Sequence, residues 1–257
     1  MNTINRHYKL GKKAVKVDSR TLKLSNYLGA VSTAALPPVK PSVNYYSAVG
    51  VWPMYRNDII GDCTCATVGH MIQCWLANAT GSNHALTEDE VVGLYSSITG
   101  YNSVDDSNDN GAVELDVLNY WKNVGVSDHK IGAYALVNMH NDNEVKSAID
   151  IFGGAYLGVQ LPQTAQGQEI WDVRDTWSQD SHAGTWGGHA INSVGYDATG
   201  VYFISWGKVM KMTWAFWHAY VDEVYAIITN DFLNGNLVTP AGFSIQQLNE
   251  DLKLVTR

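Results

Sequence analysis

Apolar residues recur every three or four positions in the first half of this 257-residue chain, which is the spacing of amphipathic helices. The clearest run, 63–79, follows Asp62, a candidate N-cap, and stops at Gly81, a residue typical of helix ends. A capping-box pattern opens a second predicted helix over 87–95, and a third is predicted over 113–123. The first half is therefore expected to be mainly helical.

The second half has a different pattern, with short runs of β-branched and aromatic residues separated by turn residues. Predicted strands lie at 130–138, 154–161, 190–195, 201–206 and 224–229, and helical spacing returns at 143–152 and 214–222. A further capping box, at Ser244 and Gln247, predicts a short helix near the end of the chain. Helices followed mainly by strands predict an α+β fold.

A cluster of three prolines just after position 36 marks a linker. It divides the chain into an N-terminal arm and linker, 1–36, and a body, 37–230. Within the body, 37–125 is the helical half and 126–230 the strand-rich half. Residues 231–257 form a C-terminal tail.

Composition excludes several classes of protein. With 46% hydrophobic and 16% charged residues, nine Trp and fourteen Tyr, the chain is not expected to be disordered. It has no run of about eighteen apolar residues, as a transmembrane helix requires. It has no apolar core of a signal peptide near its start either. We therefore expect a protein that is cytoplasmic or carried in a virion.

The net charge of −8 hides an uneven distribution, because residues 1–23 carry seven of the seventeen Lys and Arg but one acidic residue. Such a basic arm, with Lys12, Lys13 and Lys16, is suited to docking on an acidic protein surface or on nucleic acid. The alternative is a terminus that is simply solvated.

The three cysteines, Cys63, Cys65 and Cys74, lie within twelve residues. The first two are too close for an ordinary bridge, and on a helix Cys63 and Cys74 would be about 16 Å apart, so no disulfide is expected. A zinc site is not expected, because no second Cys pair is present. Cys63 stands at a predicted helix start, where the helix dipole favours a thiolate, although many cysteines are simply small buried residues.

A histidine supplies a candidate partner for this thiol. His189 follows a glycine pair and opens an apolar strand. Together with Cys63 it resembles the papain-like cysteine peptidases, of a divergent, disulfide-free, bacterial or phage type. The resemblance implies an α+β papain-like fold, with a helical left half, a strand-rich, barrel-like right half and a cleft between them.

Three motifs carry this resemblance, and together they cover about 37–230. The family's proline, glutamine and glycine before the catalytic cysteine correspond to Pro53, Asn57 and Gly61. Its His-Ala-x-x-x-Val-Gly-Tyr motif is present at 189–196. Its Asn-Ser-Trp-Gly motif appears as Ile-Ser-Trp-Gly at 204–207.

The resemblance implies a role for each matching residue. Cys63 would attack a carbonyl carbon, and His189 would take the thiol proton and pass it to the leaving group. The backbone N–H of Cys63 and the side chain of Asn57, one methylene shorter than the family's glutamine, would form the oxyanion hole. Trp206 would shield the site from water.

One departure matters for activity. The family's histidine-orienting asparagine is Ile204 here, a hydrocarbon that cannot accept the imidazole N–H, and the neighbouring Ser205 is the candidate substitute. The leading function is a cysteine peptidase or amide hydrolase that acts on a peptide or protein through an acyl-enzyme. The alternative is a weakly active or inactive shell that serves as a structural or host-attachment component of a phage virion or other large assembly.

Neither function calls for a cofactor, a metal or a membrane. The peptidase hypothesis makes a geometric prediction, in which Cys63 Sγ and a ring nitrogen of His189 lie within about 4 Å of each other and face an open cleft. A plugged cleft would favour the shell.

Overall fold

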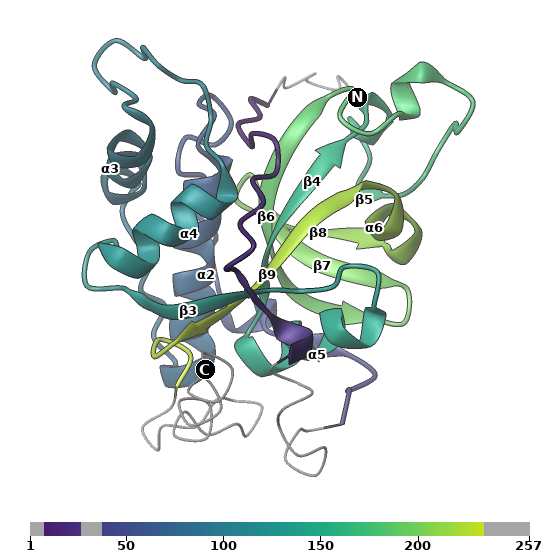
Figure 1. The fold of residues 1–257 in the computed structure, drawn as a ribbon, viewed down its shortest axis with the longest axis horizontal. Coiled ribbons are helices and arrows are strands. Elements are labelled where there is room, and N and C mark those ends of the chain that lie inside the picture. The colour runs from purple at the N-terminus through teal and green to yellow at the C-terminus, as the bar shows by residue number, and fades with distance from the viewer. Residues whose placement is uncertain (1–7, 27–37, 234–257) are drawn as a thin grey trace.

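The computed structural model describes residues 8–26 and 38–233, with helices on one side of the molecule and strands on the other (Figure 1). The helical side contains α2 (Cys63–Thr80), α3 (Glu88–Thr99) and α4 (Glu114–Asn123). α2 ends at Gly81, whose φ of 73° lies in the left-handed region that glycine adopts readily. α3 begins with the predicted capping box, in which Thr87 and Glu90 each bond the other's backbone N–H.

The other side is a nine-stranded sheet in which most neighbouring strands are antiparallel. Its strands are β1 (Leu22–Lys23), β2 (Val43–Asn44), β3 (Ile131–Leu136), β4 (Ala155–Leu161), β5 (Ile170–Trp171), β6 (Gly187–Asp197), β7 (Gly200–Ser205), β8 (Lys208–Thr213) and β9 (Val221–Thr229). Their order is β1-β3-β9-β4-β6-β7-β8-β5, and β2 also pairs with β6. The remaining helices are α5 (Asp142–Phe152), α6 (Trp214–Tyr220) and the short 3-10 turns η1 (Tyr46–Ala48), η2 (Gln163–Ala165) and η3 (Gln179–Ser181). The predicted α+β class is confirmed.

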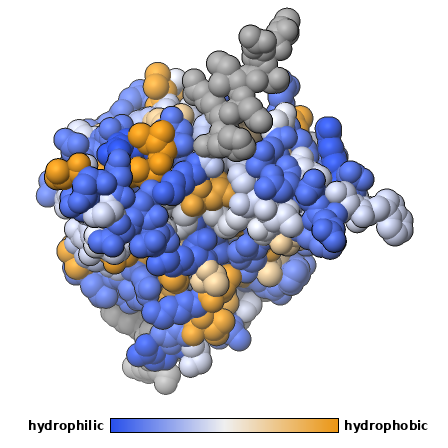
Figure 2. All heavy atoms as spheres, turned by 90° about the horizontal axis from the view of Figure 1, so that it is seen from above, coloured by the Kyte–Doolittle hydropathy of each residue, from blue (hydrophilic) through white to orange (hydrophobic). Residues whose placement is uncertain are grey.

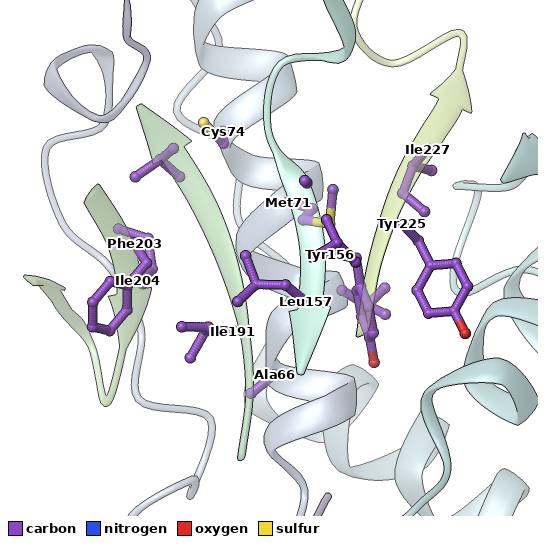
Figure 3. Packing of buried hydrophobic residues seen from close by; sticks show 14 of the residues in the cluster. Ala66, Met71, Cys74, Tyr156, Leu157, Ile191, Phe203, Ile204, Tyr225 and Ile227 are labelled. Atoms are coloured by element: carbon purple, nitrogen blue, oxygen red, sulfur yellow. The ribbon is translucent and has the colours of Figure 1, made fainter. Parts of the chain in front are cut away.

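The main core lies where α2 packs against the centre of the sheet. Figure 3 shows side chains of α2, β4, β6, β7 and β9 meeting there, among them Met71, Leu157 and Ile191. Each is 1% exposed or less, and burying a large aliphatic side chain contributes about 1.5–3 kcal/mol. The ring of Trp75, also in α2, stacks on Trp121 of α4 with centroids 5.6 Å apart. This packing holds the first residue of α2 in place beside β6.

Several local predictions need correction. Asp62 occupies the N-cap position of α2, but its side chain accepts no capping hydrogen bond. The predicted helix over 214–222 ends at Tyr220, because the chain then pairs with β4 as part of β9. β8, which the sequence pattern did not predict, precedes that helix. The predicted tail helix with Ser244 and Gln247 lies outside the described residues.

The described part of the N-terminal arm lies on the body. Residues 8–16, which we call the cleft segment, run between the helical side and the sheet (Figure 1). The chain then forms β1, whose Leu22 pairs in parallel with Ala135 of β3. The alternative of a solvated terminus is therefore wrong for the cleft segment.

One face of the molecule carries small, separate apolar areas (Figure 2). Figure 2 shows a mainly hydrophilic face with scattered hydrophobic groups. Among the described residues, no helix is long and apolar enough to span a membrane.

Candidate active site

The thiol of Cys63 lies at the junction of the two sides of the molecule. Cys63 is the first residue of α2, and its Sγ accepts a hydrogen bond from the N–H of Ala190 in β6 at 3.4 Å. The N–H of Gly11, in the cleft segment, also bonds to this sulfur. The first N–H groups of a helix lack intrahelical acceptors and carry the positive end of its dipole. Backbone donors from two separate segments therefore bond to the sulfur, which also stands at the positive end of the α2 dipole.

His189 is oriented by a hydroxyl. Its Nε2 lies 2.7 Å from Oγ of Ser205, at the end of the neighbouring strand β7. Ile204, which matches the family's asparagine in sequence, is buried in the apolar core instead. The β6–β7 ladder is irregular between Ser193 and Gly195. The structure thus pairs His189 with the residue named as the candidate substitute.

Asn57 is buried and already engaged. Its Nδ2 donates a hydrogen bond to Oδ1 of Asp62 at 3.0 Å. Burial raises the pKa of Asp62 well above its usual range, although the bond from Asn57 acts in the opposite direction. An amide nitrogen has two hydrogens, so this bond fixes the amide and leaves one for a second acceptor. Asp62, predicted only as an N-cap, is therefore a support for the expected oxyanion donor.

The cleft segment is hydrogen-bonded to both walls of the site. The N–H of Lys12 donates to the carbonyl of Gly188 in β6 at 3.1 Å. On the helical side, the N–H of Lys13 donates to the carbonyl of Ala112 at 2.9 Å, and the N–H of Ala112 donates to the carbonyl of Gly11 at 2.8 Å. These bonds form an isolated parallel β-bridge between Lys12 and Ala112. The walls thus bind this peptide through its backbone.

Glycines make this close approach possible. A Cβ added at Gly11 would lie 1.8 Å from the carbonyl oxygen of Gly61. One added at Gly111 would lie 2.0 Å from the Gly11 oxygen, and one at Gly188 would lie 2.4 Å from the Lys12 oxygen. Such distances are well below van der Waals contact, so any larger residue would push the segment out. The cleft is shaped to receive a backbone.

Aromatic rings cover the imidazole. The ring of Trp206 stacks on His189 with centroids 4.7 Å apart, and Tyr8 stacks on Trp206 at 4.2 Å. Trp206 adopts a φ of 49°, which is rare for a large residue, and Gly207 follows at 68°. This turn places the indole over the histidine, where the sequence resemblance predicts a shield.

Burial by the cleft segment suppresses charge at the site, since Cys63 and His189 both have 0% exposure. Burial raises the pKa of Cys63 to about 12, although the N–H groups of Ala190 and Gly11 act in the opposite direction. Burial also lowers the pKa of His189 to about 3. Within the described residues, Nδ1 of His189 has no hydrogen-bond partner. The structure therefore favours a neutral thiol and a neutral imidazole over the expected thiolate.

The prediction of an open cleft is wrong for this structure, because the chain's own N-terminal residues fill it. The basic arm docks on acidic groups of its own body. Lys12 pairs with two carboxylates, and Lys16 Nζ lies 2.7 Å from Oδ1 of Asp116. Docking on another protein or on nucleic acid has no support from these contacts.

Sequence reasoning missed the residues that close the site. Gly11 and Lys12 stood out only as part of a basic arm, and the acidic residues Glu114 and Glu223 lie in other elements. The only local signal for this closure was that a glycine, Gly11, directly precedes a lysine, Lys12, in the basic arm. No group of three or more His, Cys, Asp or Glu residues in 8–26 and 38–233 is arranged to hold a metal ion.

Solved structures with a similar fold are papain-like cysteine proteases. Xylellain, a cysteine protease from Xylella fastidiosa, matches over 89% of this chain and 99% of its own, with 14% identity and a TM-score of 0.64. Procathepsin B from Trypanosoma congolense matches over 88% and 87%, with 10% identity and a TM-score of 0.58. Digestive procathepsin L 3 from Tenebrio molitor matches over 85% and 76%, with 14% identity and a TM-score of 0.52.

No family model matches the sequence, and none of the curated proteins is detectably similar to it. The three structural matches establish that the chain has the papain-like fold, as the sequence motifs predicted.

Proposed function

We propose that this protein is a cysteine peptidase and that the structure is its closed form. One observation carries the proposal: the Cys63 thiol stands at a helix N-terminus against the strand that holds His189, whose Nε2 is fixed by Ser205. Three elements thereby supply a candidate nucleophile, a candidate base and a group that orients the base, which supports the proposal. The fold at this site is that of cysteine proteases.

The chemistry follows from these positions once the cleft segment leaves. Nδ1 of His189 takes the proton of the Cys63 thiol, and the thiolate forms a bond to the substrate carbonyl carbon. The oxyanion accepts hydrogen bonds from the Cys63 N–H and from Asn57. The C–N bond then breaks as the imidazolium gives its proton to the leaving amine. Water, deprotonated by His189, hydrolyses the thioester and restores the thiol.

The closed form explains why the catalytic groups are buried without excluding catalysis. The segment is held mainly by backbone hydrogen bonds, ring stacking and ion pairs, and Tyr8 and Leu10 pack against the edge of the apolar core. Two of the matching structures are named as pro-forms of cathepsins, which fits a closed precursor. A virion or host-attachment role has no comparable observation in its favour.

The test is peptide hydrolysis by the full chain carrying Gly11→Leu, a change that prevents the segment from docking. We expect hydrolysis that Cys63→Ala abolishes in the same background. Alkylation of Cys63 by iodoacetamide serves as the control that the site is open. Rapid alkylation with no hydrolysis of a mixed peptide pool would contradict the proposal and favour the inactive shell.

A second test addresses Ser205. In the Gly11→Leu background, Ser205→Ala should lower kcat about 10- to 100-fold, because the imidazole loses its orienting partner. Ser205→Asn offers a side-chain oxygen in its place and should recover part of the rate. Equal rates for all three proteins would show that His189 needs no partner at Nε2.

A further inference from the structure

The side chain of Lys12 fills an enclosed pocket next to the thiol. It has no solvent exposure, and its Nζ lies 2.9 Å from Oδ2 of Asp222 and 2.9 Å from Oε1 of Glu223. Both carboxylates stand at the start of β9. The pocket therefore binds a cationic side chain.

A third carboxyl group makes the pocket more acidic than one lysine requires. Glu114, the first residue of α4, is fully buried, and within the described residues neither of its carboxyl oxygens has a hydrogen-bond partner. Burial alone would lower the pKa of Lys12, but Glu114, Glu223 and Asp222 together raise it above its usual range. Burial, and next to it the charge of Glu223, raise the pKa of Glu114 well above its usual range, so Glu114 is the neutral member of the group and has no hydrogen-bond partner among the described residues even with Lys12 in place.

A glycine gives the pocket its depth. Gly158 of β4 pairs in register with Ala190 on one side and Glu223 on the other, so the pocket lies beside the strand that carries the histidine. A Cβ at this position would lie 1.9 Å from Lys12 Cε and 2.8 Å from Glu114 Oε1. A larger residue here would fill the space that the lysine occupies. We call the group formed by Glu114, Gly158, Asp222 and Glu223 the acidic pocket.

The position of the pocket relates it to the reaction. Gly11 bonds to the Cys63 sulfur through its N–H, and Lys12 is the next residue. In the cleft segment an N–H faces the sulfur, and the Gly11 carbonyl is turned to the N–H of Ala112. A substrate that the same walls hold with a carbonyl at the thiol would place a neighbouring side chain in the acidic pocket. We propose that the acidic pocket is the specificity site of the enzyme and selects a lysine or arginine side chain one residue removed from the carbonyl that Cys63 attacks. This inference rests on the proposed peptidase function.

The selection comes mainly from rejecting other side chains. A buried ion pair gains little over a well-packed apolar contact, but a buried carboxylate left without its partner is strongly disfavoured. A leucine in the pocket would leave Asp222 and Glu223 without a cation, with only the neutral donors Gln160 and Tyr225, and a glutamate would add a like charge. By analogy with sites that hold buried polar groups for a substrate, we expect basic peptides to be preferred about 100-fold over otherwise identical leucine peptides.

The experiment uses the full chain with Gly11→Leu and internally quenched peptides that differ at one position, occupied by lysine, leucine or glutamate. Mass spectrometry locates each cleaved bond relative to that position. We expect kcat/KM to be about 100-fold higher for the lysine peptide than for the leucine peptide. Glu114→Gln combined with Glu223→Gln should reduce this ratio to below about tenfold, and Gly158→Ala should reduce lysine cleavage while leaving leucine cleavage measurable.

A binding measurement separates this inference from the proposed function. Each peptide is tested for protection of Cys63 against iodoacetamide, which requires no catalysis. Protection by the lysine peptide alone, with no cleavage of any peptide, would support the acidic pocket and contradict the peptidase proposal. Equal cleavage and equal protection by lysine and leucine peptides would overturn the inference, because the pocket would then serve Lys12 alone.

Discussion

Two buried regions of this molecule are held together by different physical means. The core between α2 and the sheet is apolar, with side chains such as Met71 and Leu157 almost fully buried. The interface between the cleft segment and its walls is built from glycines, backbone hydrogen bonds and the ion pairs of Lys12. Apolar packing is non-directional and roughly proportional to area, whereas the second interface depends mainly on a peptide backbone and one cationic side chain, with smaller apolar contacts from Tyr8 and Leu10.

The two regions therefore have different roles: the core positions the candidate catalytic residues, and the cleft segment closes the site. The core fixes Cys63 and His189 on elements that do not separate unless the protein unfolds. We expect the cleft segment to leave without unfolding that core, since most of its contacts to the walls are backbone hydrogen bonds that another peptide could make. The predictions below separate the two regions, from the largest expected effect to the smallest.

The largest effect is expected from Gly11→Leu. The Cβ of a leucine at this position would lie 1.8 Å from the Gly61 carbonyl oxygen, so the segment should leave and the Cys63 thiol should become exposed to solvent. Burial raises the thiol pKa from 9.0 to about 12, so opening should speed iodoacetamide alkylation of Cys63 about 1,000-fold near neutral pH. Peptide mass spectrometry distinguishes this thiol from Cys65 and Cys74.

The matched control for this substitution is Gly50→Ala, because a Cβ at Gly50 meets nothing within 4 Å. It should leave the Cys63 alkylation rate unchanged. A similar rate for the wild type and Gly11→Leu would show that the segment does not protect the thiol.

A substitution in the core should lower the stability of the protein without exposing Cys63. Leu157→Ala removes a fully buried side chain and should lower the free energy of unfolding by about 2–5 kcal/mol in a denaturant titration. Cys63 alkylation in the absence of denaturant should stay slow, because the cleft contacts are intact. Rapid alkylation in this variant would mean that the two regions open together.

Acid should weaken the closed state. Burial lowers the pKa of His189 from 6.5 to about 3, so the open form takes up a proton more readily than the closed form. Closure is therefore fully favoured above about pH 6.5 and is lost progressively as the pH falls towards 3, by up to about tenfold per pH unit. Hydrogen exchange at the N–H groups of Lys12 and Ala112 measures the opening.

A second buried histidine provides an internal reference for the acid effect. Burial lowers the pKa of His70 to about 4, and its Nε2 lies 2.8 Å from the Pro53 carbonyl, away from the cleft segment. His70→Gln should leave the pH dependence of opening unchanged, whereas His189→Gln should weaken it strongly and leave only the part that comes from protonation of the carboxylates paired with Lys12. An unchanged profile in His189→Gln would contradict the assignment.

The smallest effect is expected from Lys16→Ala. Lys16 and Asp116 form an exposed ion pair, with side chains 57% and 43% accessible. Such pairs contribute about 0–1 kcal/mol, so Cys63 alkylation should change less than about fivefold. A larger change would show that the end of the cleft segment, and not Lys12, controls closure.

The sequence by itself determined the local elements and the order of the motifs. The spacing over 63–79, the stop at Gly81 and the capping box at Thr87 are short-range signals, and the helices follow them closely. The Cys-His-Ser-Trp order was sufficient to predict the papain-like fold.

Tertiary structure decided which side chains meet and whether the site is open. Ser205 and not Ile204 reaches His189, because the pairing of β6 with β7 sets which side chains face the cleft. The docking of Lys12 against carboxyl groups from α4 and β9 joins residues separated by about a hundred positions or more, which no local pattern encodes. The protonation of Cys63 followed from the same docking: its helix-end position favours a thiolate, but burial by a distant segment outweighs the dipole.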